Sequence, residues 1–168
     1  MARTDHDLAL VRAVSHVAFR DGYPTLEIQP YKDICEGEEI ATCGYPLGNF
    51  LFEQIGTIIP SFTRGSISSI VPRQDIPLEQ LKSFQLNLTA TYGNNGGPVF
   101  SLSSGKVFGV LQGGIKDQQS KILPGLARAE PVYPIVNSRD VSLIKSFPPG
   151  QLPADLEERV RKRADLAD

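Results

Sequence analysis

Residues 90–100 have the sequence Ala-Thr-Tyr-Gly-Asn-Asn-Gly-Gly-Pro-Val-Phe. Glycines bracket the pair Asn94 and Asn95, and a short apolar run follows Pro98. Because glycine adopts positive φ without a steric penalty, this composition predicts a sharp loop that leads into a strand. Such a loop presents one side chain beside a group of backbone N–H donors. Taken alone, the segment indicates no more than a turn.

The sequence on both sides of this loop predicts β structure. Runs rich in β-branched and aromatic residues alternate with turn residues, and the regular spacing favours a small closed barrel or a sandwich. The hairpin turn Ser103–Lys106 contains Gly105, which is suited to positive φ. The predicted strands are Glu39–Gly44, Phe52–Ile59, Gly65–Val71, Phe84–Ala90, Val99–Leu102, Val107–Gln112 and Leu126–Val132.

The two ends of the chain differ from this central part. Residues 8–14 form a short apolar run that suits a buried strand, and residues 15–29 have the turn-rich composition of a linker. Apolar residues after Pro134 fit one helix. Residues 153–164 begin with proline and acids and end with bases, which predicts a solvated terminal helix rather than a partner-docking one. We therefore expect segments 1–30, 31–147 and 148–168.

Composition restricts the function classes. The chain has 168 residues, 40% of them hydrophobic, and a net charge of −2, so it lacks the positive charge that nucleic-acid binding needs. It has neither an apolar leader nor a run near the ~20 residues that span a bilayer, so we expect no membrane partner and, by default, a cytoplasmic protein. Cys35 and Cys43 have no ligand-spaced neighbours, which favours free thiols over a disulfide or a metal. No cofactor is expected.

The loop at 90–100 resembles the Gly-(Asp/Asn)-Ser-Gly-Gly-Pro nucleophile loop of trypsin-like serine peptidases, including the HtrA-like and glutamyl-endopeptidase-like branches. Four further segments are similar to this family in the correct order. They are the strand and turn at 38–48, the Thr-Arg-Gly-Ser-Ile-Ser strand at 63–68, the strand at 106–114 along which substrate lies, and the pocket wall at 123–127.

The resemblance implies an all-β trypsin-like peptidase fold. The chain would supply the second six-stranded β-barrel, a remnant of the first barrel before it and a short C-terminal helix after it. Asn95 stands at the nucleophile position, and the N–H groups of Gly93 and Asn95 would form the oxyanion site. Asp7, in Asp-His-Asp-Leu-Ala-Leu-Val at 5–11, would be the triad acid, although an exposed aspartate before a strand is the simpler alternative.

The resemblance also implies a peptide-binding cleft. An extended peptide would pair with the strand Leu111, Gln112, Gly113 and Gly114 by β-augmentation. Thr89, six residues before Asn95, would form the floor of an uncharged specificity pocket, with Gly114 and Gly125 on its walls.

Two departures from the family argue against catalysis. The amide of Asn95 offers no nucleophile that a base can activate. The family's histidine comes tens of residues before the aspartate, whereas His6 adjoins Asp7 and His16 follows it. Thr91 and Ser101 flank the loop without occupying its exposed position. We therefore expect an inactive homologue.

The alternatives to an inactive homologue are a truncated or inactivated form of an active endopeptidase, and a scaffold for protein partners. An orphan strand at 8–14 would also promote self-association or capture of a partner that completes the first barrel.

Overall fold

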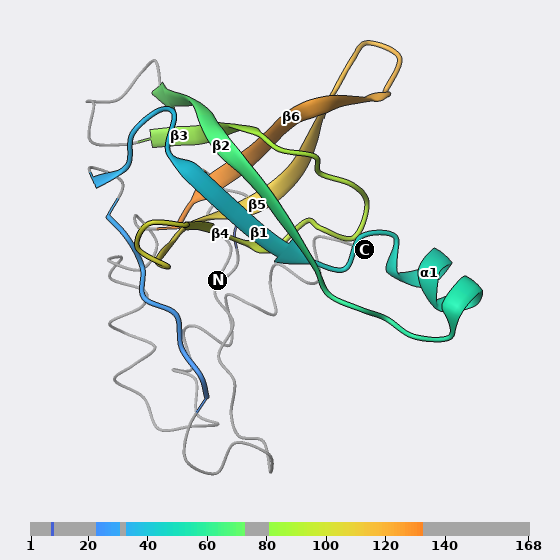
Figure 1. The fold of residues 1–168 in the computed structure, drawn as a ribbon. Helices are drawn as coiled ribbons and strands as arrows, with labels where there is room; N and C mark the ends of the chain where they lie inside the picture. Colours follow the sequence, from blue (N-terminus) through green and yellow to red (C-terminus); the bar gives the residue numbers. More distant parts are fainter. Residues whose placement is uncertain (1–7, 9–22, 31–32, 73–80, 133–168) are drawn as a thin grey trace, which may run out of the picture. The chain divides into compact units, whose positions relative to one another are not determined.

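The computed structural model describes residues 8, 23–30, 33–72 and 81–132, which Figure 1 draws in colour. By contacts between its residues, the chain divides into one compact unit, Leu26–Pro134, and another formed by Met1–Thr25 with Ile135–Asp168. The described residues lie almost wholly in the first unit. The fold below is that of this unit.

Six antiparallel strands form a closed barrel in the order β1-β2-β3-β6-β5-β4. Pairing of β1 with β4 closes it, with Ile40 opposite Ser101 and Thr42 opposite Val99. Over the length where the strands pair around the barrel, closure removes the exposed edges that an open sheet would leave. The strands are β1 Glu39–Gly44, β2 Ser61–Pro72, β3 Leu81–Asn87, β4 Pro98–Ser101, β5 Val107–Lys116 and β6 Ile122–Pro131. The prediction of an all-β fold with a six-stranded barrel is confirmed.

The barrel encloses one apolar core. Burial alternates along β4 and, within β5, from Gly109 to Gly114, as expected of strands with one solvated face. Phe84 and Phe108 meet edge to face at its centre, with ring centroids 5.0 Å apart. The cluster comprises Ile34, Ile40, Ile67, Phe84, Leu86, Leu88, Ala90, Val99, Phe108, Leu111, Ala127 and Ala129. The core fixes both strands that flank the loop at 91–97.

Most predicted strands occur, with shifted ends. The strand Glu39–Gly44 has the predicted bounds, whereas β5 continues to Lys116 and β6 begins at Ile122. The turn between β4 and β5 contains Gly105 at φ 70°, as the hairpin prediction requires. Both cysteines are free thiols, with Cys35 exposed and Cys43 half-buried.

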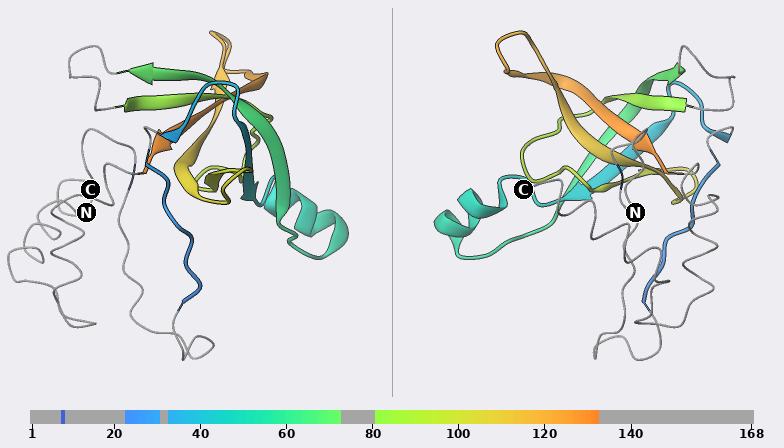
Figure 2. Two further views of the ribbon diagram at one scale, coloured as in Figure 1. Left: turned by 60° about the vertical axis from the view of Figure 1, so that its left-hand side comes forward. Right: turned by 180° about the vertical axis from the view of Figure 1, so that it is seen from behind.

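The strand predicted at Phe52–Ile59 is wrong. This segment contains the helix α1, Gly48–Ile55, followed by an extended stretch that leads to β2. Leu47, Phe50, Leu51 and Ile55 recur at helical spacing in the sequence, and Gly56 ends the helix at φ 71° with its N–H bonded to the carbonyl of Phe52. Aromatic and β-branched residues favour a strand here, whereas the spacing of the apolar residues follows the 3.6-residue period of a helix. Figures 1 and 2 show α1 projecting from the end of the barrel.

Residues 26–30 are attached to the barrel. Ile28 forms a parallel bridge with Val107, where Gln29 donates its N–H to Val107 O (2.8 Å) and Val107 donates to Glu27 O (2.8 Å). Lys106 Nζ lies 2.8 Å from Glu27 Oε2. The segment therefore pairs with the start of β5 through one isolated bridge.

Other predictions fall outside the described residues. They are the strand at 8–14 apart from Leu8, Asp7, and the helices after Pro134. The predicted self-association depends on the strand at 8–14 and is not tested either. Among the described helices and strands, no helix is long and apolar enough to cross a membrane.

Candidate peptide-binding site

The loop at 91–97 consists of two successive turns. Asn94 donates its N–H to Thr91 O (3.2 Å), and Gly97 donates to Asn94 O (3.1 Å). Gly93 has φ 96°, and a Cβ there would lie 2.1 Å from Tyr45 O. A larger residue at 93 would therefore both strain the backbone and collide with the neighbouring segment. This is the tight, glycine-dependent loop that the sequence predicts.

Hydrogen bonds hold the loop between two elements. On one side, Tyr45 and Leu47 donate to the carbonyls of Gly93 and Tyr92, at 3.3 and 2.7 Å. These bonds join the loop to the segment between β1 and α1. Its conformation on this side is therefore set by backbone contacts rather than by side chains.

On the other side, Leu111 of β5 uses both of its backbone groups. Gly96 donates to Leu111 O (2.8 Å), and Leu111 donates to Gly97 O (2.9 Å). The Leu111 side chain is 1% exposed and belongs to the core. The sequence predicts that Leu111 contacts substrate, whereas in the structure its backbone N–H and carbonyl hold the loop against β5.

Asn95 is exposed, and its carboxamide lies against Gly113 of β5. A Cβ on Gly113, which has φ 118°, would be 2.6 Å from Asn95 Oδ1 and 3.2 Å from Nδ2. Within the described part of the chain, neither Gly93 nor Asn95 donates its backbone N–H to a hydrogen bond. Two N–H donors and one carboxamide are thus available to a ligand at the loop.

Asn94 points the opposite way from Asn95. It is 4% exposed, its Oδ1 lies against Gly44 of β1, and no described residue donates a hydrogen bond to that oxygen. Thr42 Oγ1 and Thr91 Oγ1 are likewise buried without a described partner.

The hydroxyls that flank the loop are unavailable for chemistry. Ser101 is fully buried, and its hydroxyl donates to the Glu38 carboxylate. The buried Thr91 hydroxyl also does not reach the surface. Neither occupies the exposed position that Asn95 holds.

Beyond the loop, β5 has one open edge. Its pairing with β4 ends where Val110 faces Pro98, whereas its pairing with β6 continues to Lys116. From Gln112 onward no described strand pairs with the second edge. The Gln112 side chain bonds to β6 instead of covering this edge. Its Oε1 accepts a hydrogen bond from Arg128 Nε (2.8 Å). This edge begins beside Asn95.

The predicted pocket residues lie around the end of β5. Thr89 is exposed and precedes the buried Ala90, whose carbonyl lies near Gly114. A Cβ on Gly114 would be 2.5 Å from Ile122 Cγ2, so Ile122 occupies the space next to this wall. Gly125, at φ 70°, lies close to Asn87 Oδ1 rather than to Gly114. The sequence analysis missed Ile122, which the β5–β6 register places opposite Lys116.

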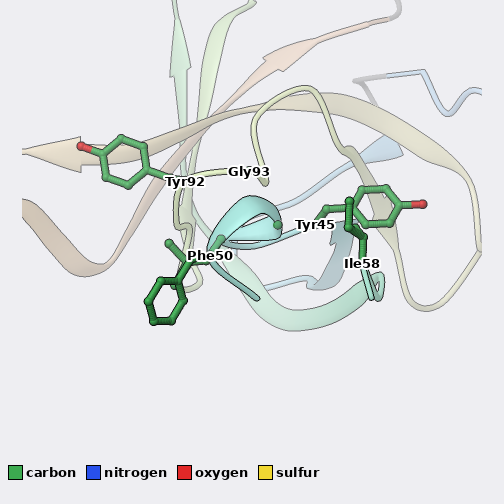
Figure 3. Close-up of a pocket in the computed structure, with 7 residues that line it drawn as sticks. Tyr45, Phe50, Ile58, Tyr92 and Gly93 are labelled. Carbon is green, nitrogen blue, oxygen red and sulfur yellow. The ribbon is translucent and has the colours of Figure 1, made fainter. Parts of the chain in front are cut away.

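An apolar groove lies on the other side of the loop (Figure 3). It has a volume of about 850 Å³ and is lined by Tyr45, Leu47, Gly48, Phe50, Ile58, Tyr92 and Gly93. The sequence analysis missed it, because the strand expected at 52–59 would have placed these side chains differently. Among the described residues no group of His, Cys, Asp or Glu could hold a metal ion.

Comparisons with known proteins agree with the fold. A family model described as "Trypsin-like peptidase domain" matches residues 1–110. A variant of the HtrA-type protease AlgW, solved with a decapeptide, has a TM-score of 0.52 and 20% identity, covering 77% of this chain and 34% of that one. AlgW with a tripeptide has a TM-score of 0.50 and 19% identity, covering 73% and 35%. This chain thus corresponds to about a third of those structures. A search of curated proteins found no match.

Proposed function

Because the chain belongs to the trypsin-like peptidase domain family, we propose that it binds extended peptides without cleaving them. The open edge of β5 from Gln112 to Gly114 carries this proposal, since it offers backbone groups beside a loop whose donors are free. Strand edges of this kind bind peptides as an added strand. The HtrA-type protease of similar fold was solved with peptides, which supports peptide as the ligand class.

The loop contributes binding rather than chemistry. The N–H groups of Gly93 and Asn95 would donate to a peptide carbonyl that reaches the loop, as an oxyanion site does. A carboxamide at 95 can donate and accept hydrogen bonds, but it does not ionise to a nucleophile. We also propose Asp7 as the position of the triad acid. The alternatives are a scaffold role towards protein partners and a truncated or inactivated form of an active endopeptidase.

Thr89, Gly114 and Gly125 would select the side chain next to the loop. No ionisable group stands at these positions, so we propose an uncharged residue there. Ile122 beside Gly114 leaves less room on that wall, which favours a small side chain over a large one.

The test compares two fluorescent peptides of uncharged residues by anisotropy with the full chain. One has an ordinary backbone, and the other has N-methyl groups at alternate residues of its centre. N-methylation removes peptide donors without altering the protein. Since a net hydrogen bond contributes about 0.5–1.5 kcal/mol, loss of two should weaken binding by roughly 10- to 100-fold.

Equal affinity of the two peptides would exclude strand addition as the binding mode. Cleavage of the unmodified peptide, followed by mass spectrometry, would overturn the inactivity and support the endopeptidase alternative. Binding without cleavage, weakened by N-methylation, is the expected result.

A further inference from the structure

We infer that a pocket on the outer face of β1, β2 and β4 binds an arginine side chain of a partner polypeptide. This outer pocket has a volume of about 550 Å³ and is lined by Glu38, Glu39, Phe62, Arg64, Leu102 and Ser103. None of these residues belongs to the loop at 91–97 or to β5. The inference is therefore independent of peptide addition to the edge of β5.

The pairing of the strands brings the lining residues together. β1 lies between β2 and β4, as Figure 1 shows. On one side of β1, Arg64 of β2 is the register partner of Ala41. On the other side, Leu102 follows β4 and donates its N–H to Glu39 O (3.0 Å). The backbone on both sides of the outer pocket is thus fixed by the closed barrel.

Two phenyl rings form an aromatic wall at the outer pocket. The rings of Phe62 and Phe100 meet across β1, with centroids 5.9 Å apart and planes inclined by 56°. Between them Ala41 is fully buried, although its neighbour Ile40 belongs to the core and Ala41 therefore faces outward. Phe62 is still 57% exposed and lines the outer pocket. It offers an aromatic ring to a cationic ligand.

The carboxylate of Glu38 is held in place by two serines. The hydroxyl of the fully buried Ser101 donates to Glu38 Oε1. Ser103 Oγ lies 2.8 Å from Ser101 Oγ and 3.4 Å from the same carboxylate oxygen. Among the described residues, none donates a hydrogen bond to Glu38 Oε2. One oxygen is thus fixed by the barrel, and the other can accept from a ligand.

The charges of the outer pocket leave this carboxylate without a counterion. Arg64 Nη2 lies 3.8 Å from Glu39 Oε1, so these two charges offset each other. In the part of the chain that the structure describes, no lysine or arginine forms an ion pair with Glu38. Glu38 is half-buried, and attraction between charges is stronger where less water screens them. Charge complementarity therefore selects a cationic ligand.

Arginine fits this combination of groups better than lysine does. Its planar guanidinium can stack on the Phe62 ring while one N–H donates to Glu38 Oε2. Its aliphatic stem can lie along the apolar side chain of Leu102. The remaining apolar surface of Phe62 and Leu102 suits the residues beside the arginine, which favours a polypeptide over a free guanidinium compound.

The experiment follows the amide NMR signals of the full ¹⁵N-labelled chain as the peptide acetyl-Leu-Arg-Leu-amide is added. The matched peptide contains citrulline, which has the shape of arginine without its charge. The arginine peptide should shift the amides of Leu102 and Ser103 and bind about tenfold more tightly than the citrulline peptide, because hydrogen bonds to charged groups are the stronger ones. The lysine peptide and agmatine should both bind more weakly than the arginine peptide.

Matched variants locate the effect. Glu38→Gln should abolish the advantage of arginine over citrulline, whereas Glu36→Gln should keep it. Both changes remove one negative charge, but the Glu36 carboxylate accepts the N–H of Ile70 (2.9 Å) and does not line the outer pocket. Arg64→Gln should tighten binding of the arginine peptide, because it removes a positive charge and releases Glu39. Weaker binding by Arg64→Gln would contradict the inference.

Three other outcomes would overturn it. Equal binding of the arginine and citrulline peptides by the unchanged chain would refute the outer pocket, and this comparison requires no variant to fold. Equal effects of Glu38→Gln and Glu36→Gln would show non-specific attraction, and shifts confined to Gln112–Gly114 would show addition to β5 instead. Equal binding of agmatine would replace the polypeptide by a small guanidinium compound. The N-methylated peptides test the proposed function separately, so either proposal can fail alone.

Discussion

At residue 95 the backbone and the side chain have separable roles. The loop around Asn95 is held by the hydrogen bond that Gly96 donates to Leu111, by the one that Leu111 donates to Gly97, and by the contact of Gly93 with Tyr45. None of these involves the Asn95 side chain. A change of that side chain should therefore leave the loop intact. The consequence that we propose for the asparagine is chemical, since its amide does not ionise to a nucleophile.

Asn95→Ser tests this separation directly. The variant should fold normally yet give no turnover of peptide substrates and no labelling by a fluorophosphonate probe, like the unchanged chain and the control Asn95→Ala. A serine needs a base, and loss of the base or nucleophile of a triad costs about 10⁶-fold in turnover. His6 adjoins Asp7, and adjacent residues of an extended chain point to opposite faces, so Asp7 would not orient it. Stoichiometric labelling of Asn95→Ser would show that a histidine of this chain acts as the base.

Among the elements, the segment 26–30 and β5 are joined by an ion pair with a defined pH dependence. The Lys106 ammonium donates a hydrogen bond to Glu27 and attracts its carboxylate, and this lowers the pKa of Glu27 from its ordinary 4.5. The same interactions raise the pKa of Lys106 from 10.5. The pair stabilises the attachment above the ordinary pKa of Glu27 and loses that effect as pH falls through the lowered pKa. At high pH it is lost as pH rises through the raised pKa of Lys106.

NMR titration of the Glu27 carboxyl carbon measures this effect. The midpoint should lie below 4.5 in the unchanged chain and return towards 4.5 in Lys106→Met. High salt should have the same direction of effect, because both groups are solvent-exposed and are screened. Lys121→Met, at the β5–β6 turn, serves as the control and should leave the midpoint unchanged. A midpoint insensitive to Lys106→Met would show that the pair does not form in solution.

The elements differ in how far the sequence could predict them. β1 was predictable to the residue because its β-prone run ends at the turn that begins with Gly44. The loop at 91–97 was predictable because glycines at 93 and 96 are needed where φ is positive. α1 was not, since Phe and Ile suit strands and only the spacing of Leu47, Phe50 and Ile55 indicates a helix. The groove and Ile122 depend on how separate elements meet, which no local pattern encodes.

At the scale of the whole molecule, the barrel includes more chain than its six strands. Gln29 is 7% exposed, its Nε2 donates to Asp33 O, and its Oε1 accepts a hydrogen bond from Ser104 of the β4–β5 turn (2.6 Å). With the bridge at Val107, these contacts connect residues 26–30 to the barrel at several points. The compact unit accordingly begins at Leu26, within the segment 15–29 whose composition is typical of a linker.

Two truncated chains, 26–134 and 31–134, measure what this segment contributes. Both lack the rest of the chain, so they differ only in residues 26–30. We expect both to fold, with 31–134 less stable by about 2–4 kcal/mol, because it loses two backbone bonds to Val107 and the bond from Ser104 at about 0.5–1.5 kcal/mol each, together with the buried Gln29. Against a typical stability of about 5–15 kcal/mol, such a loss is readily measured by urea unfolding. Amide exchange at Val107 should be faster in 31–134, because its acceptor, Glu27 O, is absent. Equal unfolding free energies would show that residues 26–30 lie on the barrel without stabilising it, whereas failure of 26–134 to fold would show that the barrel depends on chain outside this unit.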